Sequence, residues 1–178
     1  MNVSARTATT PRVLINVALY QAGWFACVLG GARDRSAVGM AVAAMIVSGW
    51  LIVAPRPGAL LQLVVLTGVV GYSWDSWLSV LGLIHYSGAS SVSALAPLWI
   101  LALWLLFATT LPIALRWLQS KLLLASLLGA MAAPLAYYGA ERLGALEFSG
   151  ALAALGAEAA GWALLLPLLL RLSRRLDV

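Results

Sequence analysis

The sequence predicts an all-α polytopic membrane protein, a bundle of six transmembrane helices. Of its 178 residues, 63% are hydrophobic and only 10% are charged, and the mean hydropathy is +0.97. Soluble domains are about 45–50% apolar and about 25% charged. In addition, long apolar runs alternate with short breaks that hold proline, glycine or charge. We therefore predict a single transmembrane domain over residues 1–178, with helices at about 13–30, 37–54, 58–84, 94–115, 122–140 and 150–170.

The first two runs carry packing signals. Small residues recur every four positions in the first run, which predicts a face that another helix can approach closely: Ala18, Ala22, Ala26 and Gly30. Gln21 lies beside this stripe, so it is expected to face protein. The second run ends at Pro55-Arg56-Pro57, because prolines cannot continue a helix.

The third run, 58–84, contains a carboxylate, Asp75, in Gly71-Tyr72-Ser73-Trp74-Asp75-Ser76-Trp77. A helix of this length spans about 40 Å, more than the roughly 30 Å of hydrocarbon, so it must tilt or project. Small and polar residues follow 3–4 spacing on one face: Gly68, Gly71, Tyr72, Asp75, Ser79 and Gly82. This face is expected to pack inward.

The last three runs contain prolines. Pro97 is tolerated in the first turn of 94–115, and Pro112 falls near its far end. Pro134 lies well inside the fifth run and predicts a kink. The spacing of Ala125, Gly129 and Ala133 predicts a second close-packing face. The sixth run carries a carboxylate, Glu158.

Positive charge gathers on one side of the predicted topology. One set of connections and both tails hold Arg6, Arg12, Arg56, Arg116, Lys121, Arg171, Arg174 and Arg175. The other set holds Arg33, Arg35 and Arg142, balanced by Asp34, Glu141 and Glu147. Cytoplasmic loops carry the excess of Lys and Arg. We therefore expect a multi-pass protein of the bacterial inner membrane with both termini cytoplasmic. Asp75 then lies in the outer half of its helix.

Asp75 and Glu158 are the leading site candidates, because ionisable residues inside a membrane are costly and commonly functional. Asp75 could carry a proton, a cation or a substrate. Alternatively it fixes helix packing, with Gln21, Ser79 or a backbone carbonyl as partner. Glu158 could share a proton or cation with Asp75, or lie close enough to the surface to be wetted.

Other candidates are weaker. Asn16 and Gln21 suit hydrogen bonds between helices better than ligand binding. Tyr72 and Trp74 belong to a surplus of aromatic residues expected near the outer side, where they could line a groove. His85 could act as a general base, although a lone histidine in a serine-rich loop is commonly solvated.

Several classes of chemistry are disfavoured. The lone cysteine, Cys27, cannot form an internal disulfide, and the lone histidine, His85, excludes di-iron histidine boxes and bis-histidine haem. There is no phosphate-binding glycine loop, metal-ligand pair at helical spacing or Gly-x-Ser-x-Gly elbow. We expect no metal and no cofactor. Because the net charge of +5 lies in the breaks between spans, anionic lipid, not nucleic acid, is the expected partner.

Three segments carry a family resemblance: Asn16…Gln21-Ala22-Gly23-Trp24-Phe25-Ala26-Cys27, then Asp75-Ser76, then Pro97-Leu98-Trp99…Leu103-Trp104…Phe107-Ala108-Thr109-Thr110-Leu111. They resemble a family of small proteobacterial inner-membrane proteins known as a domain of unknown function, over nearly the whole chain. The resemblance implies about six helices and a role near membrane lipid modification. It implies no catalytic residue.

Three functions compete. The first is an accessory protein that holds a membrane lipid or a partner, such as a lipid-modifying enzyme or another membrane protein, in a groove around Asp75. The second is a small proton- or cation-coupled transporter that uses Asp75 and Glu158. The third is a lipid-modifying membrane enzyme with Asp75 or His85 as general base. No motif identifies a reaction, so the first is preferred.

Overall fold

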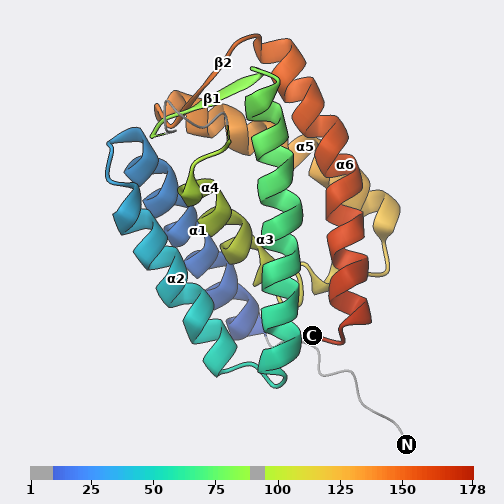
Figure 1. Ribbon diagram of the computed structural model, residues 1–178. Coiled ribbons are helices and arrows are strands. Elements are labelled where there is room, and N and C mark those ends of the chain that lie inside the picture. Colours follow the sequence, from blue (N-terminus) through green and yellow to red (C-terminus); the bar gives the residue numbers. More distant parts are fainter. Residues whose placement is uncertain (1–9, 89–94) are drawn as a thin grey trace, which may run out of the picture.

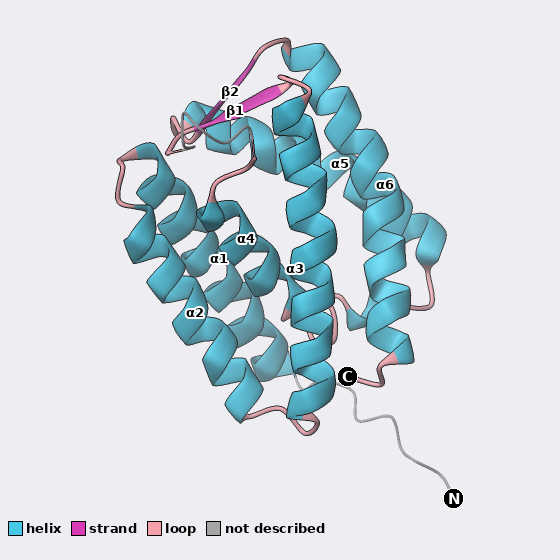
Figure 2. Ribbon diagram, viewed as in Figure 1, coloured by secondary structure: helices cyan, strands magenta, loops and turns pink. Residues whose placement is uncertain are grey.

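The computed structural model describes residues 10–88 and 95–178, and these form a helical bundle with one small sheet (Figure 2). The helices are α1 (Thr10–Ala32), α2 (Ser36–Ile52), α3 (Pro57–Val80), α4 (Leu98–Ala108), α5 (Leu122–Arg142) and α6 (Ala151–Arg175). A single 3-10 turn, η1, covers Arg116–Leu118. The strands are β1 (Ile84–Tyr86) and β2 (Leu146–Phe148), which pair antiparallel. The all-helical prediction is therefore confirmed.

Four of these helices, α1, α3, α5 and α6, are long and apolar enough to cross a membrane, which indicates an integral membrane protein. The other two are apolar but shorter. The 17 residues of α2 span about 25 Å and the 11 residues of α4 about 16 Å, against roughly 30 Å of hydrocarbon.

The helices pack in two pairs with α3 between them (Figure 1). The first pair is α1 with α2, and the second is α5 with α6. On one side α3 packs against α4, which also contacts α1 and α2, and on the other it contacts α6.

Small residues permit the closest of these contacts, although not all of those predicted. In α5, Ala125, Gly129 and Ala133 are buried as expected. A Cβ on Gly129 would overlap the Trp162 carbonyl of α6. In α1 the predicted stripe is wrong for its first half, because Ala18 and Ala22 are exposed. The buried face of α1 instead includes Asn16, Gly23, Cys27 and Gly30.

The fourth helix is much shorter than the predicted 94–115. It begins at Leu98 after Pro97 and ends at Ala108, and the chain continues through buried turns. Pro112 has no N–H for the Ala108 carbonyl, so the helix cannot pass this point. The hydroxyls of Thr109 and Thr110 donate to backbone carbonyls of the last helical turn, each at 2.7 Å. Irregular backbone at membrane depth is tolerated where protein buries it.

The third helix also ends early, at Val80 and not at residue 84. Gly82 turns the chain at φ +68°, and β1 follows. Successive side chains in a strand point to opposite faces. Ile84 and Tyr86 are accordingly buried, while His85 is exposed. The strand thereby directs Tyr86 into the bundle.

The bundle has two chemically distinct ends. At one end, Arg56 forms an ion pair with Asp177, which places the α2–α3 connection beside the end of α6. We call this the basic end, because it also holds Lys121, Arg171, Arg174 and Arg175. The opposite end, which we call the sheet end, carries β1 and β2 (Figure 1).

Candidate functional site

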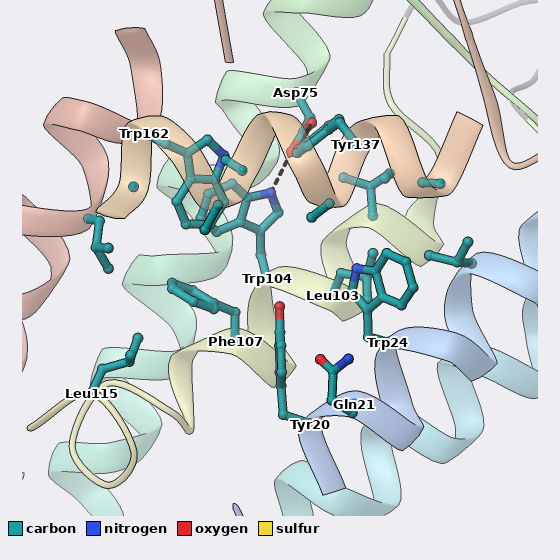
Figure 3. A pocket seen from close by; sticks show the side chains of 18 of the residues that line it. Tyr20, Gln21, Trp24, Asp75, Leu103, Trp104, Phe107, Leu115, Tyr137 and Trp162 are labelled. Carbon is teal, nitrogen blue, oxygen red and sulfur yellow. Dashed lines mark hydrogen bonds between the residues drawn. The ribbon is translucent and has the colours of Figure 1, made fainter. Parts of the chain in front are cut away.

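Asp75 is fully buried on α3 and receives three hydrogen bonds from three other elements. The hydroxyls of Tyr86 and Tyr137 each donate to its Oδ1 at 2.5 Å. The indole Nε1 of Trp104 donates to Oδ2 at 2.5 Å. Figure 3 shows this last bond as a dashed line. An indole nitrogen can only donate, so Oδ2 is an acceptor.

Local structure brings each donor to Asp75. Trp104 of α4 lies flat on α3 because Gly71, one turn before Asp75, has no side chain. A Cβ on Gly71 would overlap the indole. Tyr137 lies one turn after the buried Ala133 of α5 and is half-buried, and β1 turns Tyr86 inward. Burial, and then the negative charge of Asp75, raise the pKa of the Tyr86 hydroxyl well above its ordinary value, so this group keeps its proton and can donate.

The second carboxylate, Glu158 of α6, is also fully buried. Trp74 donates a long hydrogen bond of 3.4 Å to its Oε2. Within the described part of the chain, its Oε1 has no partner, and neither has Nε1 of Trp162 one turn further along. The Trp74 indole can approach Glu158 because Gly161 of α6 has no side chain. A Cβ on Gly161 would overlap this indole. The alternative that Glu158 lies close enough to the surface to be wetted is wrong, because its side chain is fully buried.

A cavity of about 490 Å³ lies beside Asp75, between α1 and α4 on one side and α5 and α6 on the other. Its wall is mostly apolar and aromatic. The aromatic residues that line it include Tyr20, Trp24, Trp104, Phe107, Tyr137 and Trp162 (Figure 3). Trp104 and Trp162 stack at 4.7 Å between ring centroids. Asp75 is the only charged residue among the described residues that line the cavity.

The exposed lining residues indicate that the cavity opens on the side of the bundle, between α1 and α5. Four lining residues from these two helices are also exposed: Gln21, Leu128, Ala132 and Ala136. Toward the sheet end, the distance between α1 and α5 becomes smaller. There, a Cβ on Gly139 of α5 would lie 3.9 Å from Trp24 of α1. At the basic end, the cavity reaches Leu115, Trp117 and Leu118.

The remaining sequence candidates divide into cavity and packing residues. Gln21 lines the cavity, but it is exposed and is not the hydrogen-bond partner of Asp75. Asn16 is buried, and its Nδ2 donates to the Thr109 carbonyl at 3.3 Å, next to the end of α4. Tyr72 donates to the Ala96 carbonyl at 2.6 Å and supports the start of α4. Of the seven candidates, Asp75 and Gln21 line the cavity.

His85 lies away from Asp75 on the exposed side of β1. Its Nε2 is 2.9 Å from Oγ of Ser149, which resembles a serine–histidine pair. The same hydroxyl donates to the Gly82 carbonyl at 2.5 Å, and it has only one proton to give. The histidine therefore donates to the serine. A general base would have to accept the serine proton instead. In the described part of the chain, no group of three or more His, Cys, Asp or Glu residues could hold a metal.

Sequence reasoning located Asp75 but missed all three of its donors. The aromatic surplus predicted near the outer side does not single out Tyr86 or Tyr137. Tyr137 follows Ala133 by four residues on a face already marked by small side chains, so helical spacing was a usable signal for it. Trp104 and Tyr86 lie beside Asp75 because of the way the connections between the helices run. No local sequence pattern predicts the course of these connections.

Comparison with curated proteins and with solved structures finds no match. One family model does match, described as "Protein of unknown function (DUF2878)", and it covers residues 13–168. This span contains every residue of the Asp75 cluster, Glu158 and the cavity wall. The match covers most of the chain, from α1 into α6. The chain therefore belongs to the DUF2878 family.

Proposed function

We propose that this protein binds a membrane lipid, holding its hydrocarbon chain in the cavity and its polar group beside Asp75. The cavity itself carries the proposal. Its volume of about 490 Å³ lies within the roughly 300–1,000 Å³ typical of small-molecule sites, which are mostly apolar with a few well-placed polar groups. Asp75, fixed by Tyr137 and Trp104, is such a group.

The side opening supports a ligand that arrives from the bilayer. The cavity opens between α1 and α5, two helices long and apolar enough to span the membrane. Leu128, Ala132 and Ala136 at this opening are apolar and exposed, so they would face hydrocarbon. A lipid chain could enter there without crossing water.

The orientation belongs to the same proposal. We propose that the basic end faces the cytoplasm of a bacterial inner membrane, because it gathers Arg56, Lys121 and the arginines that end α6. The sheet end balances Arg33, Arg35 and Arg142 with three carboxylates. Asp75 lies five residues before the end of α3, so the polar group of the lipid would sit in the outer half of the membrane.

Native mass spectrometry of the detergent-extracted protein tests the binding. The unmodified protein is expected to retain one lipid. Ala136→Phe places a ring in the cavity and should abolish retention. Leu135→Phe is the matched control, since Leu135 adjoins Ala136 on α5 but is 69% exposed and does not line the cavity. Absence of retained lipid in the unmodified protein, or equal loss in both variants, would contradict the proposal.

The paired burial of Asp75 and Glu158 favours a second candidate, a proton or cation relay. Both carboxylates are fully buried on helices that contact each other, α3 and α6. Trp74, next to Asp75 in the chain, donates to Glu158, whose other oxygen has no partner in the described part of the chain. Proteoliposomes should then show pH-dependent flux that disappears in Asp75→Asn and Glu158→Gln. Unchanged flux in both variants rules the relay out.

A further inference from the structure

We propose that Tyr20 and Gln21 of α1 hold a carbonyl group of the bound lipid, and that this lipid is uncharged. The inference rests on the lipid-binding function proposed above and adds the chemical class of the ligand. Asp75 does not carry it, because its carboxyl group is buried and already receives three hydrogen bonds from the protein. Three observations carry it: the place of the two side chains in the cavity, their lack of partners, and their depth in the membrane.

Both side chains belong to the cavity wall that α1 provides. Each lines the cavity and points from α1 into it (Figure 3). The Tyr20 ring is half-buried and packs edge-on against Phe107 of α4, with 6.1 Å between the ring centroids. Gln21 is exposed at the side opening. A ligand that enters between α1 and α5 therefore meets both side chains.

Neither polar group is paired within the protein. In the described part of the chain, the Tyr20 hydroxyl and the Gln21 amide have no hydrogen-bond partner. By contrast Asn16, one turn earlier on α1, donates to the Thr109 carbonyl at 3.3 Å. A hydroxyl or amide that stays unpaired in an apolar environment is unfavourable. A ligand group that pairs with both side chains is therefore favoured at this place.

The depth of the pair disfavours an ionic partner. The 23 residues of α1 span about 34 Å, and Tyr20 and Gln21 lie at the midpoint of the helix. In a hydrocarbon core roughly 30 Å thick, this place is far from both head-group regions. Moving an ion there is costly unless an opposite charge compensates it. No Lys, Arg or His occurs among the described lining residues, so the partner is an uncharged group.

A carbonyl oxygen meets these requirements. It accepts two hydrogen bonds and donates none, while Tyr20 supplies one O–H and Gln21 two N–H groups. One carbonyl can therefore accept from both residues. A hydroxyl would bring a proton that needs an acceptor of its own. Acylglycerol esters and isoprenoid quinones are uncharged membrane lipids with such a carbonyl. Their shared chemistry fits this wall of the cavity.

Quenching of tryptophan fluorescence tests the contact. The probes share one brominated alkyl chain, which ends in a methyl ester, in a hydroxyl or without a polar group. We expect the ester to bind about tenfold more tightly than the hydrocarbon. Tyr20→Phe and Gln21→Leu each remove one donor residue, and each should reduce this preference about threefold. Five tryptophans line the cavity and report binding: Trp24, Trp99, Trp104, Trp117 and Trp162.

The same two changes outside the cavity are the matched controls. Tyr138→Phe alters a tyrosine of α5 that is 48% exposed, and Gln62→Leu alters an exposed glutamine of α3. Neither residue lines the cavity, so the ester preference should stay unchanged in both variants. Partition of the probes into detergent is the same for all variants and cancels from the comparison.

The outcomes separate the two proposals. Equal binding of ester and hydrocarbon, tightest binding of the alcohol, or an ester preference that survives both α1 variants overturns the carbonyl contact while leaving lipid binding intact. No quenching by any probe, or quenching that Ala136→Phe does not weaken, overturns the lipid-binding function itself. The mass of the lipid retained in native mass spectrometry distinguishes an acylglycerol from a quinone, and an anionic phospholipid there would overturn the uncharged class.

Discussion

Trp104 of α4 donates a 2.5 Å hydrogen bond to Asp75 of α3, 29 residues earlier in the chain. The indole can approach because the residue one turn before Asp75 is Gly71, whose missing side chain leaves room for the ring. The bond fixes one carboxylate oxygen as an acceptor and holds the carboxylate at the cavity wall. This contact links the packing of α3 and α4 to the chemistry of the site.

Asp75→Asn should destabilise the protein. An asparagine has one acceptor oxygen, so whichever way its amide turns, at least one of the three donors loses its acceptor. A buried unpaired donor costs about 1–3 kcal/mol. Thermal unfolding in detergent should therefore show a clearly lower Tm. Glu147→Gln is the control, because Glu147 is exposed on β2 and should tolerate the change. A Tm for Asp75→Asn equal to that of the control would refute the hydrogen-bond arrangement.

Tyr86→Phe and Tyr137→Phe should each lower stability by about 0.5–1.5 kcal/mol, because each removes a hydrogen bond to the buried carboxyl group of Asp75. The double variant should not show the sum of the two losses, since both hydroxyls donate to the same Oδ1. Chemical unfolding of both single variants and the double variant gives the coupling energy. Tyr138→Phe, which changes a half-exposed neighbour of Tyr137, is the control. Strict additivity would mean that the two tyrosines do not share Asp75.

Gly71→Ala should destabilise the contact between α3 and α4. The added methyl group would overlap the Trp104 indole, and overpacking of this kind costs about 1–3 kcal/mol. Gly156→Ala in α6 is the matched control, because a Cβ there meets nothing within 4 Å. Tryptophan fluorescence and Tm together report the displacement of Trp104 and the loss of stability. If the two variants behave alike, the close approach at Gly71 is wrong.

Cysteine labelling tests the proposed orientation. The lone native cysteine, Cys27, is fully buried and should not react. In intact cells with a permeabilised outer membrane, an impermeant thiol reagent should label Glu147→Cys at the sheet end. It should not label Arg174→Cys at the basic end until the inner membrane is opened. The reverse pattern would invert the topology.

The general architecture was predictable because it depends on composition and periodicity. Apolar runs and prolines located all six helices of the described chain to within a few residues at most of their ends. The exceptions have local physical causes. Pro112 ends α4 seven residues before the predicted end, and Gly82 ends α3 early so that β1 can form. The pairing of β1 with β2 joins segments about 60 residues apart and has no local signal.

The site was predictable only as a single residue. An aspartate in an apolar run is visible in any sequence, and its burial is confirmed. Its donors come from a strand and two other helices, so they depend on how the bundle closes. Gln21 shows the same limit. Its position beside small residues predicted contact with protein, yet Ala18 and Ala22 face outward and Gln21 lies at the cavity opening.

Photo-crosslinking with a lipid probe tests the central claim most directly. The probe is an alkyl alcohol with a diazirine in its chain, and peptide mass spectrometry locates the adducts. The account predicts adducts on cavity residues such as Tyr20, Tyr137 and Trp162, suppressed by an excess of the unlabelled alcohol. Met131, which is 66% exposed on the outer side of α5, should be labelled without such suppression. Adducts confined to outward residues such as Met131, with none in the cavity, would contradict lipid binding at Asp75.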